Sequence, residues 1–388
     1  MLFSADYIFP VSTPPIKNGI VEVDEEGIIL AIYSPENFKG DRTQIQFHKG
    51  VICPGFVNVH CHLELSHLKG KLSERTGLDN FIKQLEESRG ATEIEIFSAI
   101  EESEVEMIKN GIVAVGDISN TAHSFKQKQS KRMYYHTFIE LLGFHPDKAE
   151  KAFEIGMSLY KQLIGEGSIT LHAPYSASTK LLSKINNWSG EHKSIISIHN
   201  QESEDENLLF VEKKGKILER LKQFGIDTDF FEPSGFRSLQ SALMHLAKCD
   251  KILLVHNTFT SQGDIQWAQQ LNKSIFWCFC PNANLYIENR LPNIPLFVKN
   301  NCTICIGTDS LASNWGLSIL EELKSIQKSY PQIYLAELIT WSTLNGAAFL
   351  SIENEIGSIE VGKKPGLNLI SNCDGLKLND VSNVLKLV

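Results

Sequence analysis

The sequence predicts an α/β protein: a TIM-type (β/α)8 barrel with a small flanking β-sandwich domain built from both chain ends. Three observations predict this fold, namely eight short apolar runs, helix-length segments between several of them, and polar residues at the ends of nearly all of them. Near-continuous apolar strands are typical of a parallel sheet that is covered on both faces. Eight strand–helix repeats over roughly 250 residues match a (β/α)8 barrel. The runs span residues 53–64, 111–119, 133–143, 168–176, 194–202, 251–259, 274–282 and 302–310.

The segments outside these runs predict the remaining parts of the fold. An open doubly wound sheet is the alternative for such repeats, but no Gly-x-Gly-x-x-Gly pattern follows any run, so a dinucleotide-binding sheet lacks support. Residues 16–34 have a strand–turn–strand pattern, and residues 356–371 contain short strands separated by glycines. We therefore expect a barrel over 53–352 and one small domain made of 1–52 and 353–388. Residues 203–250 are helical in pattern and are expected over the barrel mouth.

The composition excludes several classes of protein. The chain has 388 residues, of which 42% are hydrophobic and 21% charged, as in ordinary globular proteins. Its 37 basic and 46 acidic residues give a net charge of −9, which argues against a nucleic-acid polymer or an anionic membrane as partner. We identify no signal peptide, no apolar stretch of about 18 residues, and no disulfide framework among the cysteines. We expect a cytoplasmic protein that acts on a small molecule, and a homodimer is one open option.

Ionisable residues at the ends of the runs point to a metal site. The carboxyl ends of barrel strands are where active sites form, and buried ionisable groups are costly unless they are paired or bound to metal. His60 and His62 end the first run, and residues two apart on a strand face the same side. His199 ends the fifth run and Asp309 the eighth. Three imidazoles and one carboxylate at one rim suit a single Zn²⁺ or Fe²⁺ with one position left for water.

With these residues the sequence resembles the amidohydrolase superfamily, and in particular its single-metal deaminase branch. The resemblance covers nearly the whole chain and rests on PGFVNVHCHLE, HAPYSAS, HNQESEDE, HNTFT, CPNANLYI and GTDSLASNWGLSILEEL. It implies one divalent metal ion held by His60, His62, His199 and Asp309, with zinc expected first and iron or manganese accepted by the same ligands. Within the branch, VNVHCHLELSHLKG followed by GLDNFIKQL looks most like the aminodeoxyfutalosine deaminases of menaquinone biosynthesis. Adenosylhomocysteine deaminases and guanine deaminases share the metal ligands.

The resemblance also implies catalytic roles. Hydroxide formed from metal-bound water attacks the amidine carbon of an aminated heterocycle, and ammonia is released. Asp309 accepts the proton of the water, His256 orients the attack, and Glu202 protonates a ring nitrogen. Without the histidine three residues before it, Glu202 would be interpreted as an exposed acid of the run ESEDE.

Four further residues are candidate substrate contacts: His172, Glu64, Glu140 and Arg237. His172 ends the fourth run and is expected to orient the substrate, the alternative being a structural cap of its strand. Glu64 follows His62 by two residues and is expected to hold a hydroxyl or amine, or else to support a ligand histidine. Glu140 lies on the third run. Arg237 lies in the long insertion and is expected to contact an anionic group, unless it is a solvated surface residue.

A lysine is missing from the fourth run, where two-metal members of the superfamily carry a carbamylated lysine. A two-metal site is therefore disfavoured. A single metal ion that generates hydroxide, together with an acid aimed at a ring nitrogen, fits hydrolytic deamination, so the expected enzyme is a deaminase of a purine base or nucleoside derivative. One alternative is hydrolysis of a cyclic amide or triazine on the same site, as in imidazolonepropionase-like or chlorohydrolase-like members. Another is a non-catalytic scaffold, although a scaffold has no reason to keep three ligand histidines together with Asp309, His256 and Glu202.

Overall fold

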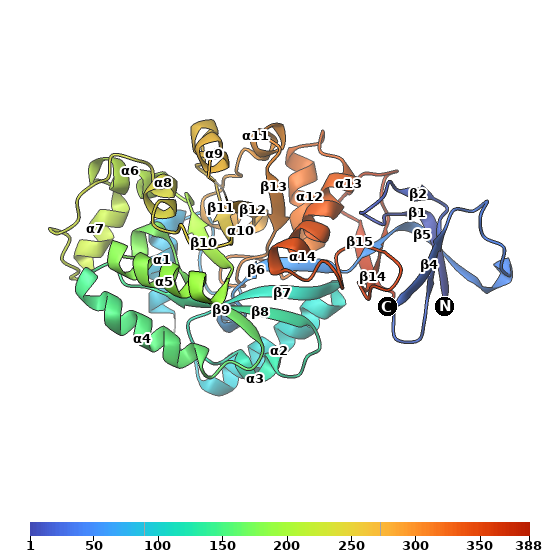
Figure 1. Cartoon of the computed structure of the whole chain (residues 1–388), viewed down its shortest axis with the longest axis horizontal. Coiled ribbons are helices and arrows are strands. Elements are labelled where there is room, and N and C mark those ends of the chain that lie inside the picture. Colours follow the sequence, from blue (N-terminus) through green and yellow to red (C-terminus); the bar gives the residue numbers. More distant parts are fainter. Residues whose placement is uncertain (89, 272) are drawn as a thin grey trace.

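Two four-stranded parallel sheets form the centre of the computed structural model, which describes residues 1–88, 90–271 and 273–388 (Figure 1). The strand orders are β6-β7-β8-β9 and β10-β11-β12-β13. Each of these strands overlaps one of the eight predicted apolar runs, which confirms an α/β chain with parallel strands. The strands are β6 (Phe56–Cys61), β7 (Ile112–Ser119), β8 (Tyr134–Leu141), β9 (Glu166–Leu171), β10 (Ile196–Asn200), β11 (Lys251–His256), β12 (Ser274–Phe279) and β13 (Thr303–Ile306).

Hydrogen bonds also connect the two sheets at both of their outer strands. The N–H of His199 donates to His172 O at 2.9 Å, which links the ends of β10 and β9. The N–H of Asp309 donates to His60 O at 3.0 Å, which links the chain after β13 to β6. A Cβ on Gly307 would lie 2.8 Å from the His60 Cβ, so a glycine is needed where these two segments approach each other.

Helices alternate with the strands along the chain. In α2, a capping box between Thr92 and Glu95 starts the helix, and Ile96, Ile100 and Met107 recur at helical spacing on its buried face. These helices are α2 (Glu93–Lys109), α4 (Ala149–Tyr160), α5 (Thr179–His192), α9 (Gln262–Gln269), α11 (Ile294–Lys299), α12 (Ile319–Ser329), α13 (Leu335–Ser342) and α14 (Leu344–Leu350). Within the described parts of the chain, no helix has both the length and the apolar character needed to cross a membrane.

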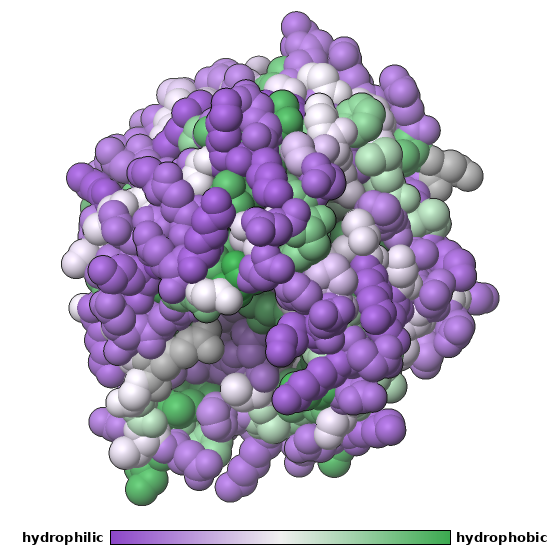
Figure 2. All heavy atoms as spheres, turned by 90° about the vertical axis from the view of Figure 1, so that its left-hand side faces the viewer, coloured by the Kyte–Doolittle hydropathy of each residue, from purple (hydrophilic) through white to green (hydrophobic). Residues whose placement is uncertain are grey.

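A second group of helices follows the carboxyl ends of the strands. Figure 1 shows α6, α7 and α8 together at the left, which confirms the helical pattern predicted for residues 203–250. Figure 2 shows that this side is mostly hydrophilic and hollowed near its centre. An ion pair of 2.5 Å between Asp79 Oδ1 and Arg220 Nε joins α1 to α7. The helices of this group are η2 (Leu63–Leu68), α1 (Gly77–Glu87), α3 (Phe125–Lys128), η3 (Pro146–Lys148), η4 (Pro174–Ser176), α6 (Glu204–Glu212), α7 (Lys216–Gln223), α8 (Ser238–Leu243) and α10 (Pro281–Ile287).

Strands from both chain ends form a separate seven-stranded sheet, at the right of Figure 1. Its order is β15-β14-β5-β1-β3-β4, with β2 paired to β1. Phe3, Val21, Ile52 and Leu369 are among the residues of its buried cluster. The elements are β1 (Leu2–Ile8), β2 (Ile16–Lys17), β3 (Ile20–Val23), β4 (Ile29–Tyr33), η1 (Arg42–Gln44), β5 (Ile45–Pro54), β14 (Leu367–Ser371) and β15 (Asn383–Lys386).

Candidate metal centre and active site

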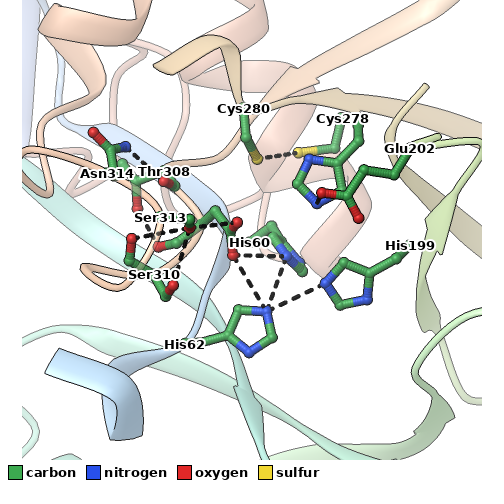
Figure 3. Close-up of polar contacts among 12 residues, drawn as sticks. His60, His62, His199, Glu202, Cys278, Cys280, Thr308, Ser310, Ser313 and Asn314 are labelled. Atoms are coloured by element: carbon green, nitrogen blue, oxygen red, sulfur yellow. Dashed lines mark hydrogen bonds and ion pairs between the residues drawn. The ribbon is translucent and has the colours of Figure 1, made fainter. Parts of the chain in front are cut away.

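The four predicted metal ligands converge where the parallel strands end. His62 Nε2 lies 3.2 Å from His60 Nε2 and 3.3 Å from His199 Nε2. Asp309 Oδ1 lies 3.4 Å from His62 Nε2 and 3.7 Å from His60 Nε2. Figure 3 shows the three imidazole rings pointing toward one another. Ligand atoms at about 2.1 Å from a tetrahedral zinc ion are about 3.4 Å apart, so the donor atoms and their spacing fit one divalent ion.

Burial keeps the three imidazoles in the neutral form that binds metal. It lowers the pKa of His62 to about 3 and that of His199 to about 4, and the neighbouring His172 adds to both effects. Burial also holds the pKa of His60 well below its usual value. His199 Nδ1 lies 2.8 Å from His172 O, where it must donate its proton, so its Nε2 carries the lone pair. The tautomer of His199 is therefore set for coordination through Nε2.

Asp309 is held by its backbone and by a neighbouring hydroxyl. Its φ of 57° lies in the left-handed region, which is uncommon for a residue other than glycine. Ser313 Oγ donates to Asp309 Oδ2 at 2.7 Å, which leaves Oδ1 to face the histidines. Burial raises the pKa of Asp309, while the nearby His199 lowers it. A bound cation would favour the ionised carboxylate.

Glu202 and His256 lie beside the metal ligands and are both buried. Glu202 Oε1 lies 3.7 Å from His256 Nε2. Burial raises the pKa of Glu202 well above its usual value, and the negative charge of Asp309 adds to this effect. Burial also lowers the pKa of His256 well below its usual value, so its ring is neutral. A buried carboxyl group with a raised pKa beside a neutral imidazole is suited to donate a proton.

His172 and Glu140 lie on the other side of His199. Glu140 Oε1 is 3.6 Å from His199 Nδ1, and its Oε2 accepts a hydrogen bond from Asn120 Nδ2 at 3.0 Å. His172 Nδ1 lies 3.2 Å from Ser176 Oγ. Ligand atoms of Glu140, His172 and His199 also lie within 4.8 Å of one another. His199 Nδ1 already donates to a carbonyl, however, so it offers no lone pair to a second ion, and the group is suited to fix the His199 ring.

Glu64 and Arg237 are both engaged by protein groups. Glu64 Oε1 accepts from Asn120 N at 3.1 Å, while Oε2 accepts from Thr121 N at 3.0 Å and from Thr121 Oγ1 at 2.8 Å. Burial raises the pKa of Glu64. Arg237 Nε donates to Asp264 Oδ2 at 3.0 Å, and its Nη2 donates to a backbone carbonyl at 2.6 Å. Contacts of these two side chains with a substrate stay predictions.

Two residues that support the site, Ser313 and Asn257, lie within the motifs GTDSLASNWGLSILEEL and HNTFT, but the sequence assigned them no role. Ser313, which orients Asp309, lies four residues further along an irregular loop. Asn257 Nδ2 donates to the carbonyl oxygens of Leu254 and Cys278 at 2.7 and 3.1 Å, which joins β11 to β12 directly after His256. The position of an amide or hydroxyl next to a motif does not indicate which distant group it contacts. Such support follows only from the folded arrangement.

Comparison with known proteins identifies the family of this chain. Residues 51–386 match the model of the Amidohydrolase family. The chain belongs to the amidohydrolase family. An adenosine deaminase of Helicobacter pylori is 26% identical over 361 residues, which cover 90% of this chain and 86% of that protein. An aminodeoxyfutalosine deaminase of Nitratiruptor sp. is 24% identical over 383 residues, which cover 95% and 91%.

A solved structure is also similar to this chain. The crystal structure of Helicobacter pylori aminofutalosine deaminase in complex with methylthio-coformycin has a TM-score of 0.82 at 23% sequence identity. The similarity covers 97% of this chain and 93% of that chain. Together, the family model and these proteins confirm the predicted class, an amidohydrolase-family deaminase that hydrolyses C–N bonds.

Proposed function

We propose that this chain is a metal-dependent deaminase of an adenosine-like nucleoside, with aminodeoxyfutalosine as one candidate substrate. The observation that carries the proposal is the convergence of three buried imidazoles and one carboxylate on one point, with the buried Glu202 beside them. Burial raises the pKa of Glu202 well above its usual value, which suits a proton donor. The names of the adenosine deaminase and aminodeoxyfutalosine deaminase relatives support an adenosine-like substrate.

The proposal includes the architecture that brings these residues together. The two parallel sheets close into a (β/α)8 barrel over residues 53–352 through the His199–His172 and Asp309–His60 hydrogen bonds. The seven-stranded sheet then forms the small flanking domain from residues 1–52 and 353–388. In such a barrel, the carboxyl ends of the strands surround the substrate.

His60, His62, His199 and Asp309 would hold the metal ion through three Nε2 atoms and Oδ1. Three nitrogen ligands and one oxygen ligand suit zinc, and iron or manganese accept the same set. When bound, such an ion lowers the pKa of a coordinated water to about 7 and so supplies a nucleophile at neutral pH.

Glu202, His256 and Asp309 carry out the proton transfers of the reaction. Glu202 donates its proton to a ring nitrogen, which makes the adjacent ring carbon more electrophilic. His256 is neutral and holds the attacking water by a hydrogen bond. Asp309 accepts a proton from that water and passes it to the leaving amine. A C–O bond forms, the exocyclic C–N bond breaks and ammonia leaves. The proton of the new hydroxyl group returns to Glu202, which restores its carboxyl and leaves a carbonyl on the ring.

The remaining predicted contacts complete the proposal. His172 is only partly buried and is proposed to orient the substrate, with Glu140, Glu64 and Arg237 as further contacts. The proposed partner is a small molecule, with neither a nucleic-acid polymer nor a membrane involved, and a homodimer stays a prediction. All eight cysteines are unpaired thiols, which supports the cytoplasm as the proposed compartment.

Ammonia release by zinc-loaded protein tests this function. The panel contains adenosine, 5′-deoxyadenosine, adenosylhomocysteine, aminodeoxyfutalosine and guanine, together with a triazine and a cyclic amide. Turnover of an adenosine-like nucleoside that is lost in Glu202→Gln supports the proposal. Turnover of the triazine or cyclic amide alone favours the alternative hydrolase, and no turnover of any compound with zinc bound rejects the deaminase.

A further inference from the structure

Two interactions compete for the His62 side chain, namely capping of a helix and binding of the metal ion. β6 ends at Cys61 and η2 begins at Leu63, so His62 is the N-cap residue of η2. An N-cap side chain usually accepts a hydrogen bond from an N–H of the first turn. The His62 ring instead faces His60 and His199, and it makes no capping hydrogen bond. The first N–H of η2 therefore needs an acceptor from elsewhere in the fold.

Asp117, on the adjacent strand β7, provides this acceptor. Its Oδ1 accepts a hydrogen bond from Leu63 N at 2.8 Å. Its Oδ2 lies 2.5 Å from Lys128 Nζ, and both side chains are buried. Lys128 Nζ also donates to Ser119 Oγ at 3.1 Å and to Thr137 Oγ1 at 3.0 Å. All three N–H bonds of the ammonium group thus have acceptors.

A buried ion pair contributes little net stability, because removing two charges from water offsets most of their attraction. The Asp117–Lys128 pair is better explained by its effect on the position of Leu63 N. A charged acceptor makes a shorter and stronger hydrogen bond to an N–H than a neutral acceptor does, and Lys128 supplies the counter-charge next to Asp117 inside the protein. The next residue of η2, Glu64, is anchored separately by the N–H groups of residues 120 and 121. The turn after His62 is therefore fixed at two consecutive residues.

We propose that Asp117 and Lys128 form a remote N-cap that positions His62 for the metal ion. Both are positioning residues, since they act through Leu63 N and not on the ion. The cap replaces the interaction that a Ser or Asp at position 62 would make, and it leaves the imidazole free to point at His60 and His199. This inference rests on the metal site of the proposed function.

Two double variants of the full chain separate the acceptor from the charges. D117N/K128M removes both charges but keeps an oxygen for the Leu63 N–H, whereas D117L/K128M removes the charges and the acceptor. K126M is the matched control, because Lys126 lies exposed on the same helix. Circular dichroism and thermal unfolding establish folding, and competition with a chromophoric chelator measures the affinity for Zn²⁺ alone.

We expect K126M to bind zinc as tightly as the original chain. D117N/K128M should bind it a few-fold more weakly, because a neutral acceptor caps Leu63 N less strongly, and D117L/K128M roughly 10- to 100-fold more weakly. Equal zinc affinity of the two double variants would overturn the proposal. If D117L/K128M does not fold, D117A/K128M takes its place. If neither folds while D117N/K128M does, the contact serves folding and not His62, and the proposal is wrong. An original chain that binds no zinc would instead contradict the metal site itself.

Discussion

Two buried carboxyl groups lie close to the same metal site and differ in what surrounds them. Asp117 faces the buried Lys128 and accepts a hydrogen bond from the backbone, so its negative charge is compensated. Glu202 faces a neutral His256 at 3.7 Å, and within the described residues no lysine or arginine forms an ion pair with it. The contrast shows how one fold gives one buried acid a counter-charge and a fixed anchoring role, and leaves another without one, so that burial raises its pKa and suits it to donate a proton.

Replacing the proposed proton donor should have the largest effect. Glu202→Gln preserves shape but removes the proton, so we expect kcat to fall about a thousandfold while zinc binding is unchanged. Steady-state deamination rates and metal analysis of the same sample check this. A variant that keeps more than a tenth of the activity would show that Glu202 is not the donor.

Removing the counter-charge of Asp117 should destabilise the fold. Lys128→Met leaves the buried Asp117 without its counter-charge, so we expect the free energy of unfolding to fall by about 3 to 5 kcal/mol. Lys126→Met, on the exposed side of the same helix, should change it by less than about 0.5 kcal/mol. Urea unfolding of both variants measures the difference. Equal stability of the two would mean that Asp117 does not depend on Lys128.

Glu206 is intermediate between Asp117 and Glu202. It accepts hydrogen bonds from Ser238 Oγ and from the N–H of Glu202, but burial still raises its pKa to about 7. An unfolded glutamate ionises near pH 4.5, so the unfolded state loses its proton first and folding stability should decrease as pH rises from about 4.5 to above 7. The shift corresponds to about 3 kcal/mol. Glu206→Gln should become more stable than the original chain by about this amount between pH 4.5 and pH 8. The free energies of unfolding of the two proteins are measured in urea over this pH range. If they change equally with pH, the raised pKa does not belong to Glu206.

The smallest effect is expected at Ser313. Ser313→Ala removes the hydrogen bond to Asp309 Oδ2, and we expect roughly tenfold weaker zinc binding. Ser313→Thr keeps the hydroxyl and should retain most of the affinity. Chelator competition distinguishes the two, and an alanine variant that binds zinc as tightly as the threonine variant would exclude a positioning role.

These examples also show what the sequence could and could not predict. The eight parallel strands and the convergence of His60, His62, His199 and Asp309 followed from strand spacing and from residues at strand ends. Lys126 and Lys128 are chemically identical within FKQK, and only the folded structure shows that Lys126 is exposed and Lys128 is buried. Side-chain partners such as these depend on tertiary contacts, which leave no local pattern.

Anomalous diffraction at the zinc edge from crystals of the zinc-loaded chain tests the central claim most directly. The account predicts one peak within about 2.3 Å of the Nε2 atoms of His60, His62 and His199 and of Asp309 Oδ1. A zinc ion bound elsewhere, in protein that still deaminates its substrate, would contradict it.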